Sequence, residues 1–400
     1  MNFLFLLLSC PDLDRTGSLY SDLALACSRG GHYVTIVTRA AEGQDTGMYK
    51  EAGITLLRVK TPRHEGVKSF WRKGFALVMM PFLYKRAYKH YLKDSPVDVI
   101  FMPTPPVTFI NCVTYIKKRT RARFYLILRD IHPQCFHRKG IHLNPLADRY
   151  LSWNAQRAYA EADYIGCMSP QNMSYLQSIA PDIEPGKIVL LPNWLHTNEY
   201  VGPDPAVRIK YGLSGKVVAV FGGTIGLAQG VENLIRLAKH YRDNPNVVFL
   251  IVGNGIRKDR LVKMADEYRL SNMRFLDSMP REEYESLLRT ADIGLVSLDT
   301  NYRVPTCPSK VIEYMAMKVP VIAMINRNND FGSFYIDRSK IGFWSDDMDS
   351  EKVYQSFDRL LDNPDLRRTC GEQGYVFYRD HFTAEEIYRQ LMQQLNSNGE

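Results

Sequence analysis

A chain of 400 residues with 45% hydrophobic and 24% charged side chains exceeds what one hydrophobic core usually serves, so two folded domains are expected. This composition excludes the collagen-like, coiled-coil and disordered classes. The net charge of +8 lies in the first half, because residues 1–200 contain 25 Lys and Arg against 16 Asp and Glu. Seven cysteines without a CxxC pair argue against a disulfide framework or a zinc ribbon and favour a reducing cytosol.

The chain opens on an apolar segment, MNFLFLLLS, which Pro11 cuts short. The segment lacks a basic start and is far shorter than the roughly 20 residues of a membrane span. We therefore interpret it as a buried parallel strand. No other stretch of the sequence approaches about 18 uninterrupted apolar residues, so any membrane contact is expected to be peripheral.

Short apolar runs alternate with helix-length amphipathic segments, which is the pattern of parallel sheets wrapped by helices. A first series of strands is expected at residues 2–8, 32–38, 55–59, 97–102, 123–128, 164–168 and 188–191. A second series is expected at residues 217–221, 247–252, 273–276, 293–298, 319–324 and 342–344. The fold class is therefore α/β, with two Rossmann-like domains.

A stretch rich in Pro and Gly, without a sustained period, separates the two series. We predict an N-terminal domain at residues 1–195, a linker at 196–214 and a C-terminal domain at 215–382. Residues 383–400 are expected to form a terminal helix, because Thr383 and Glu386 have capping-box spacing ahead of apolar residues at helical spacing. The periodicity does not show on which domain this helix packs.

Two glycine-rich loops follow neighbouring strands of the second series. Their candidate ligand-binding residues are Gly223, Thr224 and Gly226 in the first loop, and Gly253, Asn254 and Gly255 in the second. In open parallel sheets, ligands bind beyond the carboxyl ends of the strands, where glycine turns and helix N-termini present N–H groups to anions. Neither loop is a strict Rossmann fingerprint or a Walker A sequence, and each alone could be only a tight turn. Together they favour a diphosphate-binding crevice.

The segment VPTCPSKVIEYMAMKVPVIA, residues 304–323, has the most specific pattern. Pro308 and Ser309 are suited to begin a helix on which Lys310 and Glu313 share a face. The helix dipole disfavours a cation in the first turn unless an anion lies nearby, so Lys310 indicates a phosphate. Glu313 would then accept hydrogen bonds from ribose hydroxyls. The alternative is an ordinary surface ion pair between these two side chains.

PSKVIEYMAMKVPVIA, GTIGLAQGVENLI and the GNG turn together resemble the donor site of family 4 glycosyltransferases of the GT-B fold. The likeness is greatest to bacterial fucosaminyltransferase-like enzymes of O-antigen and capsule assembly. It covers nearly the whole chain, strongly at residues 217–323 and diffusely before residue 100. The resemblance implies two Rossmann-like domains facing across a cleft, a nucleotide diphosphate-sugar donor, transfer with retention, and no metal or other cofactor.

The resemblance extends donor binding from the loop residues above to Gly17, Arg257, Ser309, Lys310 and Glu313. Two features depart from the family pattern. Many members carry another glutamate eight positions before Glu313, where this chain has Pro305. Many also carry an Arg near the position of Gly223 or Thr224 and a Lys near that of Gln229. Phosphate binding would then depend on loop amides, Lys310 and either Arg257 or Arg303.

In the first half, ARFYLILRDIHPQ places Asp130 and His132 at the end of a hydrophobic strand. The resemblance puts acceptor-side chemistry at this loop, where either side chain could receive the proton of an acceptor hydroxyl as a catalytic residue. A hydrogen-bonded structural role is an equal alternative for His132. The five-residue spacing to His137 and His142 does not align on a helix face, so we expect no zinc site.

Residues 67–93 contain seven Lys or Arg and no acid around the apolar core FALVMMPFLY. These features suit an interfacial helix on an anionic membrane surface better than a base-stacking platform for nucleic acid. A helix buried in the domain, with Lys and Arg extended to solvent, is an equal alternative. The cations expected to face the membrane are Lys68, Arg72, Lys73, Lys85, Arg86, Lys89 and Lys93.

We therefore expect a glycosyltransferase of hexosyl or N-acetylhexosaminyl type. Its acceptor would be a saccharide on polyprenyl diphosphate in bacterial surface polysaccharide synthesis. The expected location is the cytoplasm, peripherally at the inner face of the cell membrane, with no nucleic acid as partner. Two alternatives stay open: a non-hydrolysing nucleotide-sugar epimerase, and an inactive scaffold subunit of a membrane glycan-assembly complex, which Pro305 would suit.

Overall fold

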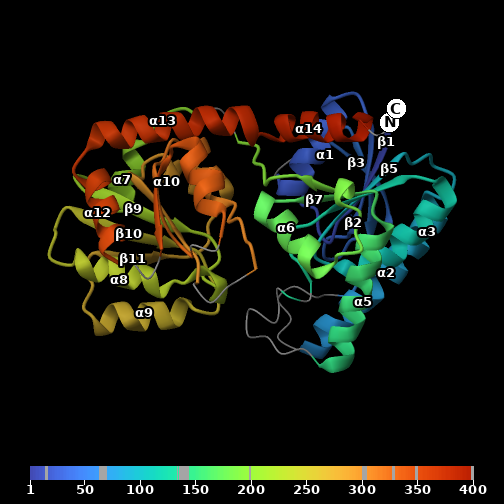
Figure 1. Ribbon diagram of the computed structural model, residues 1–400, viewed down its shortest axis with the longest axis horizontal. Coiled ribbons are helices and arrows are strands. Elements are labelled where there is room, and N and C mark those ends of the chain that lie inside the picture. Colours follow the sequence, from blue (N-terminus) through green and yellow to red (C-terminus); the bar gives the residue numbers. More distant parts are fainter. Residues whose placement is uncertain are drawn as a thin grey trace. The chain divides into compact units, whose positions relative to one another are not determined.

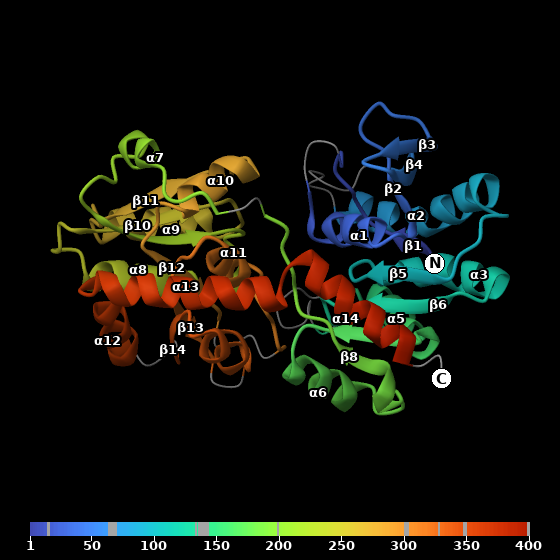
Figure 2. The same ribbon diagram turned by 90° about the horizontal axis from the view of Figure 1, so that it is seen from above.

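The computed structural model describes residues 1–13, 17–62, 70–132, 134, 144–197, 200–299, 304–326, 329–346 and 350–397. Residues 70–75 and 77 are described by their backbone only. The chain forms two compact units: unit 1 contains Met1–His196 and Ala384–Glu400, and unit 2 contains Thr197–Thr383. In each unit, helices cover both faces of a central sheet (Figures 1 and 2).

The sheet of unit 1 has the strand order β3-β4-β2-β1-β5-β6-β7-β8. Its strands are β1 (Asn2–Leu6), β2 (Tyr33–Arg39), β3 (Gly47–Glu51), β4 (Ile54–Val59), β5 (Val99–Pro103), β6 (Arg123–Ile127), β7 (Tyr164–Cys167) and β8 (Ile188–Leu190). Its helices are α1 (Leu19–Arg29), α2 (Phe70–Tyr91), α3 (Ile110–Thr120), α5 (Pro145–Glu161), α6 (Pro170–Ile179) and α14 (Ala384–Ser397). Only β3 and β4 pair antiparallel. The strand order reverses between β1 and β5, which makes their carboxyl ends the place where ligands bind in open α/β sheets.

The sheet of unit 2 is parallel, in the order β11-β10-β9-β12-β13-β14. Its strands are β9 (Val217–Gly222), β10 (Val247–Val252), β11 (Met273–Leu276), β12 (Ile293–Ser297), β13 (Val321–Ile325) and β14 (Gly342–Asp346). Its helices are α7 (Pro205–Lys210), α8 (Glu232–His240), α9 (Lys258–Glu267), α10 (Arg281–Leu288), α11 (Lys310–Ala316), α12 (Ser350–Leu361) and α13 (Pro364–His381). Here the strand order reverses between β9 and β12.

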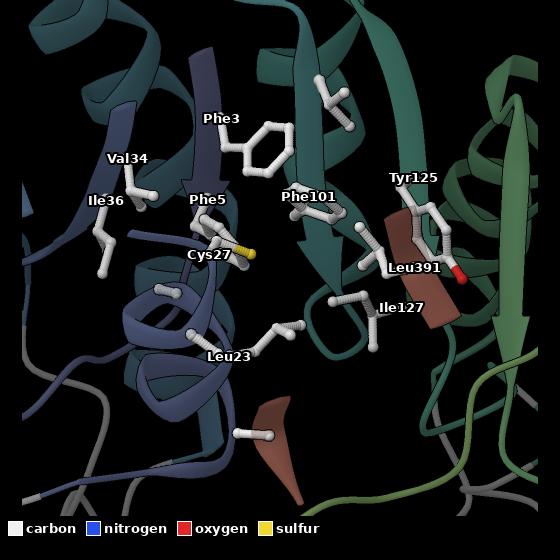
Figure 3. Close-up of a cluster of buried hydrophobic side chains, with 14 of the residues drawn as sticks. Phe3, Phe5, Leu23, Cys27, Val34, Ile36, Phe101, Tyr125, Ile127 and Leu391 are labelled. Atoms are coloured by element: carbon white, nitrogen blue, oxygen red, sulfur yellow. The ribbon is translucent and has the colours of Figure 1, made fainter. Parts of the chain in front are cut away.

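The last helix, α14, belongs to the core of unit 1 although it follows unit 2 in the chain. Leu391 of α14 is buried in one cluster with Phe5 of β1, Leu23 of α1 and Tyr125 of β6 (Figure 3). The Tyr125 hydroxyl also donates to Oε1 of Gln394 at 2.7 Å. The sequence periodicity of α14 did not show on which domain the helix packs, and these buried apolar contacts show that it packs on unit 1.

Every predicted strand is present, within two residues at either end. The antiparallel edge strand β3 was not predicted, because its sequence GMYKE has no apolar run and its residues are only partly buried or exposed. The stretch expected as a linker at 196–214 differs as well, since it contains α7. Arg208 of α7 donates to Asp292 of unit 2 at 2.7 Å, and this helix of six residues is too short to show a sequence period.

Candidate functional site

The carboxyl ends of β9 and β12 diverge at the point where the strand order of unit 2 reverses. The two strands pair only through Ile293 with Ala219 and Gly294 with Val220. Beyond that point, the Tyr314 hydroxyl accepts from the N–H of Gly222 at 3.3 Å and lies 3.2 Å from the carbonyl oxygen of Val220. The first glycine loop follows β9, and the segment with Lys310 follows β12, so both lie at the expected ligand-binding edge.

The two glycine loops pack on each other. The N–H of Ile225 donates to the carbonyl of Asn254 at 3.0 Å. A Cβ at Gly253 would lie 2.0 Å from the Gly223 carbonyl oxygen, and one at Gly255 would lie 2.2 Å from that of Ile225, so side chains are excluded there. The N–H of Gly223 donates to Val252, and that of Gly253 to Leu276. These two amides are therefore used within the sheet, and fewer loop amides than expected can face a ligand.

The Lys310 side chain is buried at the beginning of α11, with 7% of its surface exposed. Its Nζ donates to Oε1 of Gln229 at 2.9 Å and lies 3.6 Å from the centroid of the Phe221 ring. Its Cε would be 3.8 Å from a Cβ at Gly223, which places the lysine stem against the first glycine loop. Among the described residues, Gln229 is the one hydrogen-bond partner of this ammonium group, which has three hydrogens to donate.

This environment favours neutral side chains in the unliganded protein. Burial lowers the pKa of Lys310 to about 7, although the nearby Glu313 acts in the opposite direction. Burial also raises the pKa of Glu313, against the opposing effects of Lys310 and Arg281, even though Glu313 keeps part of its surface exposed. The alternative of a surface ion pair is wrong, because Lys310 is buried and bonded to Gln229.

The remaining residues predicted to bind the donor differ in how exposed they are and in whether their polar groups already have partners. Gly223, Thr224 and Ser309 are exposed, and Gly226 is partly exposed. The Ser309 side chain makes no capping hydrogen bond. Arg257 has Nη1 3.5 Å from Oε1 of Glu232, so its charge is partly neutralised. Oδ1 of Asn254 accepts from Lys258 at 3.1 Å. Arg303 lies outside the described residues.

In unit 1, the hydroxyl of Thr104 fixes the loop that carries the predicted acceptor-side residues. Its Oγ1 accepts from the N–H groups of Arg129 and Asp130 at 3.0 and 3.2 Å. Asp130 keeps part of its surface exposed, whereas His132 is only 4% exposed. The pKa of Tyr20 on α1 is raised by burial, lowered by Arg129 and raised by Asp130. Asp130 therefore lies near α1 and is the more accessible of the two predicted groups.

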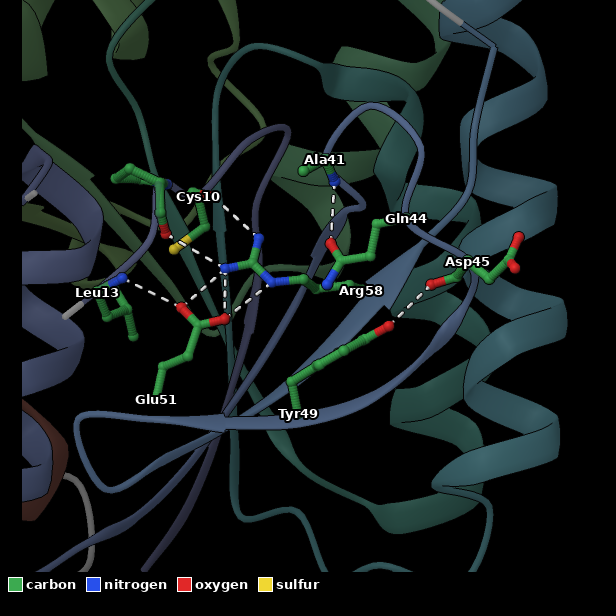
Figure 4. Close-up of polar contacts among 9 residues, drawn as sticks. Cys10, Leu13, Ala41, Gln44, Asp45, Tyr49, Glu51 and Arg58 are labelled. Atoms are coloured by element: carbon green, nitrogen blue, oxygen red, sulfur yellow. Dashed lines mark hydrogen bonds and ion pairs between the residues drawn. The ribbon is translucent and has the colours of Figure 1, made fainter. Parts of the chain in front are cut away.

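A buried ion pair contacts the segment that follows β1, at Cys10 and Leu13 (Figure 4). Arg58 of β4 donates to both carboxylate oxygens of Glu51 of β3, at 2.7 and 2.8 Å, and these side chains are 6% and 15% exposed. Arg58 also donates to the carbonyl of Cys10 at 3.3 Å, and Glu51 accepts from the N–H of Leu13 at 3.1 Å. The pair thus joins both strands of the edge hairpin to the backbone of Cys10 and Leu13.

Sequence reasoning did not identify Thr104, Tyr314 or the pair of Arg58 and Glu51. The signal for Thr104 was available, since MPTPP puts a hydroxyl directly after an apolar strand. Tyr314 follows Glu313 among apolar helix residues and has no distinguishing spacing. The ion pair depends on β3, which the sequence pattern did not reveal.

Within the described ranges, no three His, Cys, Asp or Glu side chains gather as ligands for a metal ion. His137 and His142 lie outside the ranges, so the expectation of no metal requirement stays a prediction. Within the same ranges, no helix is both long enough and apolar enough to cross a membrane.

Comparison with known proteins places this architecture in a family. Residues 205–377 match the glycosyl transferases group 1, and residues 19–194 match the glycosyl transferase 4-like domain. The putative colanic acid biosynthesis glycosyl transferase WcaI of Escherichia coli is 30% identical over 342 residues, which cover 77% of this chain and 79% of WcaI. The chain belongs to the group 1 glycosyltransferases.

Solved structures share the fold of this glycosyltransferase at low sequence identity. Sucrose-phosphate synthase from Thermosynechococcus elongatus has a TM-score of 0.74 at 17% identity, covering 99% of this chain and 98% of the synthase. HepE of Anabaena, solved in complex with UDP-glucose, has a TM-score of 0.71 at 14% identity, covering 99% and 100%. The predicted two-domain α/β fold of the GT-B type is confirmed.

Proposed function

We propose that this glycosyltransferase moves a hexosyl or N-acetylhexosaminyl group from a nucleoside diphosphate-sugar to a saccharide carried on polyprenyl diphosphate. The reaction would serve bacterial surface polysaccharide synthesis and proceed with retention and without a metal. The observation that carries the donor assignment is the buried Lys310 ammonium beside Gly223, since a diphosphate would supply the charge that this site lacks. The complex of HepE with UDP-glucose and the colanic acid biosynthesis named for WcaI support the same reaction class.

In this proposal, the bond between the sugar C1 and the diphosphate oxygen breaks as the acceptor oxygen bonds to C1 on the face that the diphosphate leaves, so the configuration at C1 is retained. Negative charge then develops on the leaving diphosphate, and the buried Lys310 stabilises it when protonated. Glu313 accepts hydrogen bonds from the ribose hydroxyls. Asp130 receives the acceptor proton, because it is partly exposed. The buried His132 is better placed to hold the loop.

Incubation with a panel of labelled nucleotide-sugars and a bacterial membrane lipid extract tests the reaction. Label that moves into the lipid fraction supports the proposal. An isomerised free nucleotide-sugar would identify an epimerase instead. No conversion, together with normal folding, would favour the scaffold alternative and agree with the absence of an acid at Pro305.

Glu313→Ala is expected to weaken UDP binding by about 1 to 3 kcal/mol, the scale of a lost hydrogen bond to a charged group. Isothermal calorimetry measures this directly. Glu282→Ala, at an exposed carboxylate of α10, is the matched control and should bind UDP like the native protein. Native affinity in Glu313→Ala would contradict the assignment of this carboxylate to the nucleotide.

Asp130→Asn is expected to lower turnover by about 10²- to 10⁴-fold, the usual contribution of a general base, with UDP affinity unchanged. His132→Gln should fold normally and lose less activity if His132 only supports the loop. Asp182→Asn, at an exposed carboxylate of unit 1, serves as control. Single-turnover rates and calorimetry separate the effects, and full activity in Asp130→Asn would remove this residue from the chemical step.

A further inference from the structure

In the part of α2 whose side chains are described, the exposed face changes from apolar to basic toward the C-terminal end of the helix. Val78 and Phe82 are 39% and 58% exposed, whereas Arg86 and Lys89 are the exposed cations further along the helix. The opposite face packs into unit 1, where the buried hydroxyl of Tyr84 donates to the Leu7 carbonyl at 3.0 Å. The helix is thus anchored along one side and presents an apolar and then a basic surface along the other.

A groove of about 810 Å³ lies between this face of α2 and the hairpin of β3 and β4; we call it the α2 groove. Phe82, Arg86 and Lys89 line it from the helix, and Val59 and Lys60 line it from the hairpin side. Among the described residues that line the groove, none is a carboxylate. The groove therefore combines an exposed aromatic ring with a cluster of cations.

In the described part of the chain, nearby carboxylates do not neutralise Lys85, Arg86 and Lys89 of α2. Lys60 is paired with Asp45 at 2.9 Å. Lys85 and Lys89 instead approach the ring of Tyr115 on α3, at 4.9 and 4.8 Å from its centroid. Within the described part of the chain, no carboxylate lies within ion-pair distance of Lys85, Arg86 or Lys89. These three charges are available to an anionic partner.

We propose that the α2 groove binds the phosphate headgroup of an anionic phospholipid, with Phe82 inserted at the boundary of the acyl chains. The helical rise places Arg86 about 6 Å and Lys89 about 10 Å beyond Phe82 along the axis. Interfacial helices bury their apolar side about 5–10 Å into the boundary of headgroups and acyl chains. A helix inclined with Phe82 at that depth therefore brings both cations to the level of the phosphates.

A membrane lipid explains the observations better than a free anion does. An inorganic phosphate or sugar phosphate would use the cations, but it gives no reason for a phenyl ring that is 58% exposed at the same groove. The proposal rests on the proposed function only in that a lipid-linked acceptor requires the enzyme to reach a membrane. Lys68, Arg72 and Lys73, which the sequence also indicated, lie where no side chain is described, and the α2 groove does not depend on them.

Co-sedimentation with vesicles tests this site in the full-length protein. The vesicles are phosphatidylcholine alone, or phosphatidylcholine with phosphatidylglycerol, over a series of salt concentrations. Arg86→Gln with Lys89→Gln should reduce partition onto the anionic vesicles by roughly 25-fold at low salt, since each cation near an anionic surface contributes about fivefold. Lys239→Gln with Lys263→Gln removes the same charge from exposed positions of unit 2 and should bind like the native protein.

Phe82→Ser separates insertion from charge attraction. Screening weakens the attraction as salt rises, so the native protein should keep a residual, salt-insensitive fraction on the vesicles, and Phe82→Ser should lose it. Native-like binding by the Arg86 and Lys89 double variant, or equal binding of the native protein to both vesicle types, would overturn the proposal.

A free anion as occupant can be recognised in parallel. Glycerol phosphate or inorganic phosphate could bind the native protein without vesicles but not the double variant of Arg86 and Lys89. If, in addition, the native protein and the double variant partition equally onto vesicles, the lipid assignment is wrong. UDP affinity is measured on every variant and should stay native. Failure of membrane docking is thereby distinguished from failure of the donor assignment, because the first leaves UDP binding intact.

Discussion

Lys310→Met is expected to weaken UDP binding by about 10- to 150-fold while raising the melting temperature of the unliganded protein. The loss corresponds to charge-assisted hydrogen bonds worth about 1.5 to 3 kcal/mol. The gain follows because burial lowers the pKa of Lys310 to about 7, which means that the folded protein disfavours the charged ammonium. A methionine of similar length removes that cost and packs against the Phe221 ring. Such exchange of stability for activity is common where a site needs a strained group.

The stability gain should depend on pH in a defined direction. The pKa of Lys310 is lower in the folded than in the unfolded protein, so between pH 7 and about 10.5 the unfolded chain binds more protons. Stability of the native protein at this residue therefore rises with pH in that window. The advantage of Lys310→Met should be largest at or below pH 7 and shrink above it. Lys263→Met, at an exposed position of α9, should show neither change.

The same lysine links UDP binding to proton uptake. Because burial lowers the pKa of Lys310 to about 7, part of the unliganded protein carries a neutral lysine at pH 8, and a bound diphosphate favours the return of the proton. UDP binding should then take up as much as one proton, and the affinity should fall between pH 7 and 9. Calorimetry in buffers with different ionisation enthalpies measures the uptake, which Lys310→Met should abolish. Binding without proton uptake in the native protein would mean that Lys310 does not contact the phosphates.

The parallel-sheet fold was predictable because each buried strand has a local apolar run and each glycine loop follows one. The prominence of Lys310 was predictable for a related reason, since a cation in the first helical turn conflicts with the helix dipole. Its burial was not predictable, because the covering groups, Phe221 and Gln229, come from another strand and loop about 80 to 90 positions earlier. Only the folded sheet brings them together.

Features formed by distant parts of the chain were hidden for the same reason. The periodicity of α14 showed a buried face but not its partner, and β1 and α1, more than 350 positions away, provide that partner. The ion pair of Glu51 and Arg58 was hidden because β3 is a partly exposed edge strand without an apolar run. Charged residues in a sequence are normally read as solvated, so a buried pair leaves little local signal.

Arg58→Met and Glu51→Leu, made singly, are each expected to destabilise unit 1 by about 3 to 5 kcal/mol, because each leaves an unpaired charge in a buried place. The double variant should recover most of this loss, since both charges are then absent. Lys60→Met with Asp45→Leu removes an ion pair of the same hairpin whose side chains are 69% and 83% exposed, and it should change stability little. Calorimetric unfolding of the single and double variants gives the stability changes, which together form a double-mutant cycle for the Arg58 and Glu51 pair.

The double variant also tests what the pair does for the reaction. Arg58 and Glu51 contact the backbone of Cys10 and Leu13, so a stable protein without the pair should hold these two residues less well. They precede the predicted donor-side residue Gly17 in the chain. The double variant should then turn over more slowly than the native protein, although its melting temperature and its UDP affinity are like those of the native protein. If the double variant recovers both stability and turnover, the two charges only neutralise each other in the buried site and have no role in the reaction. Two single variants as stable as the native protein would mean that the pair is open to water in solution.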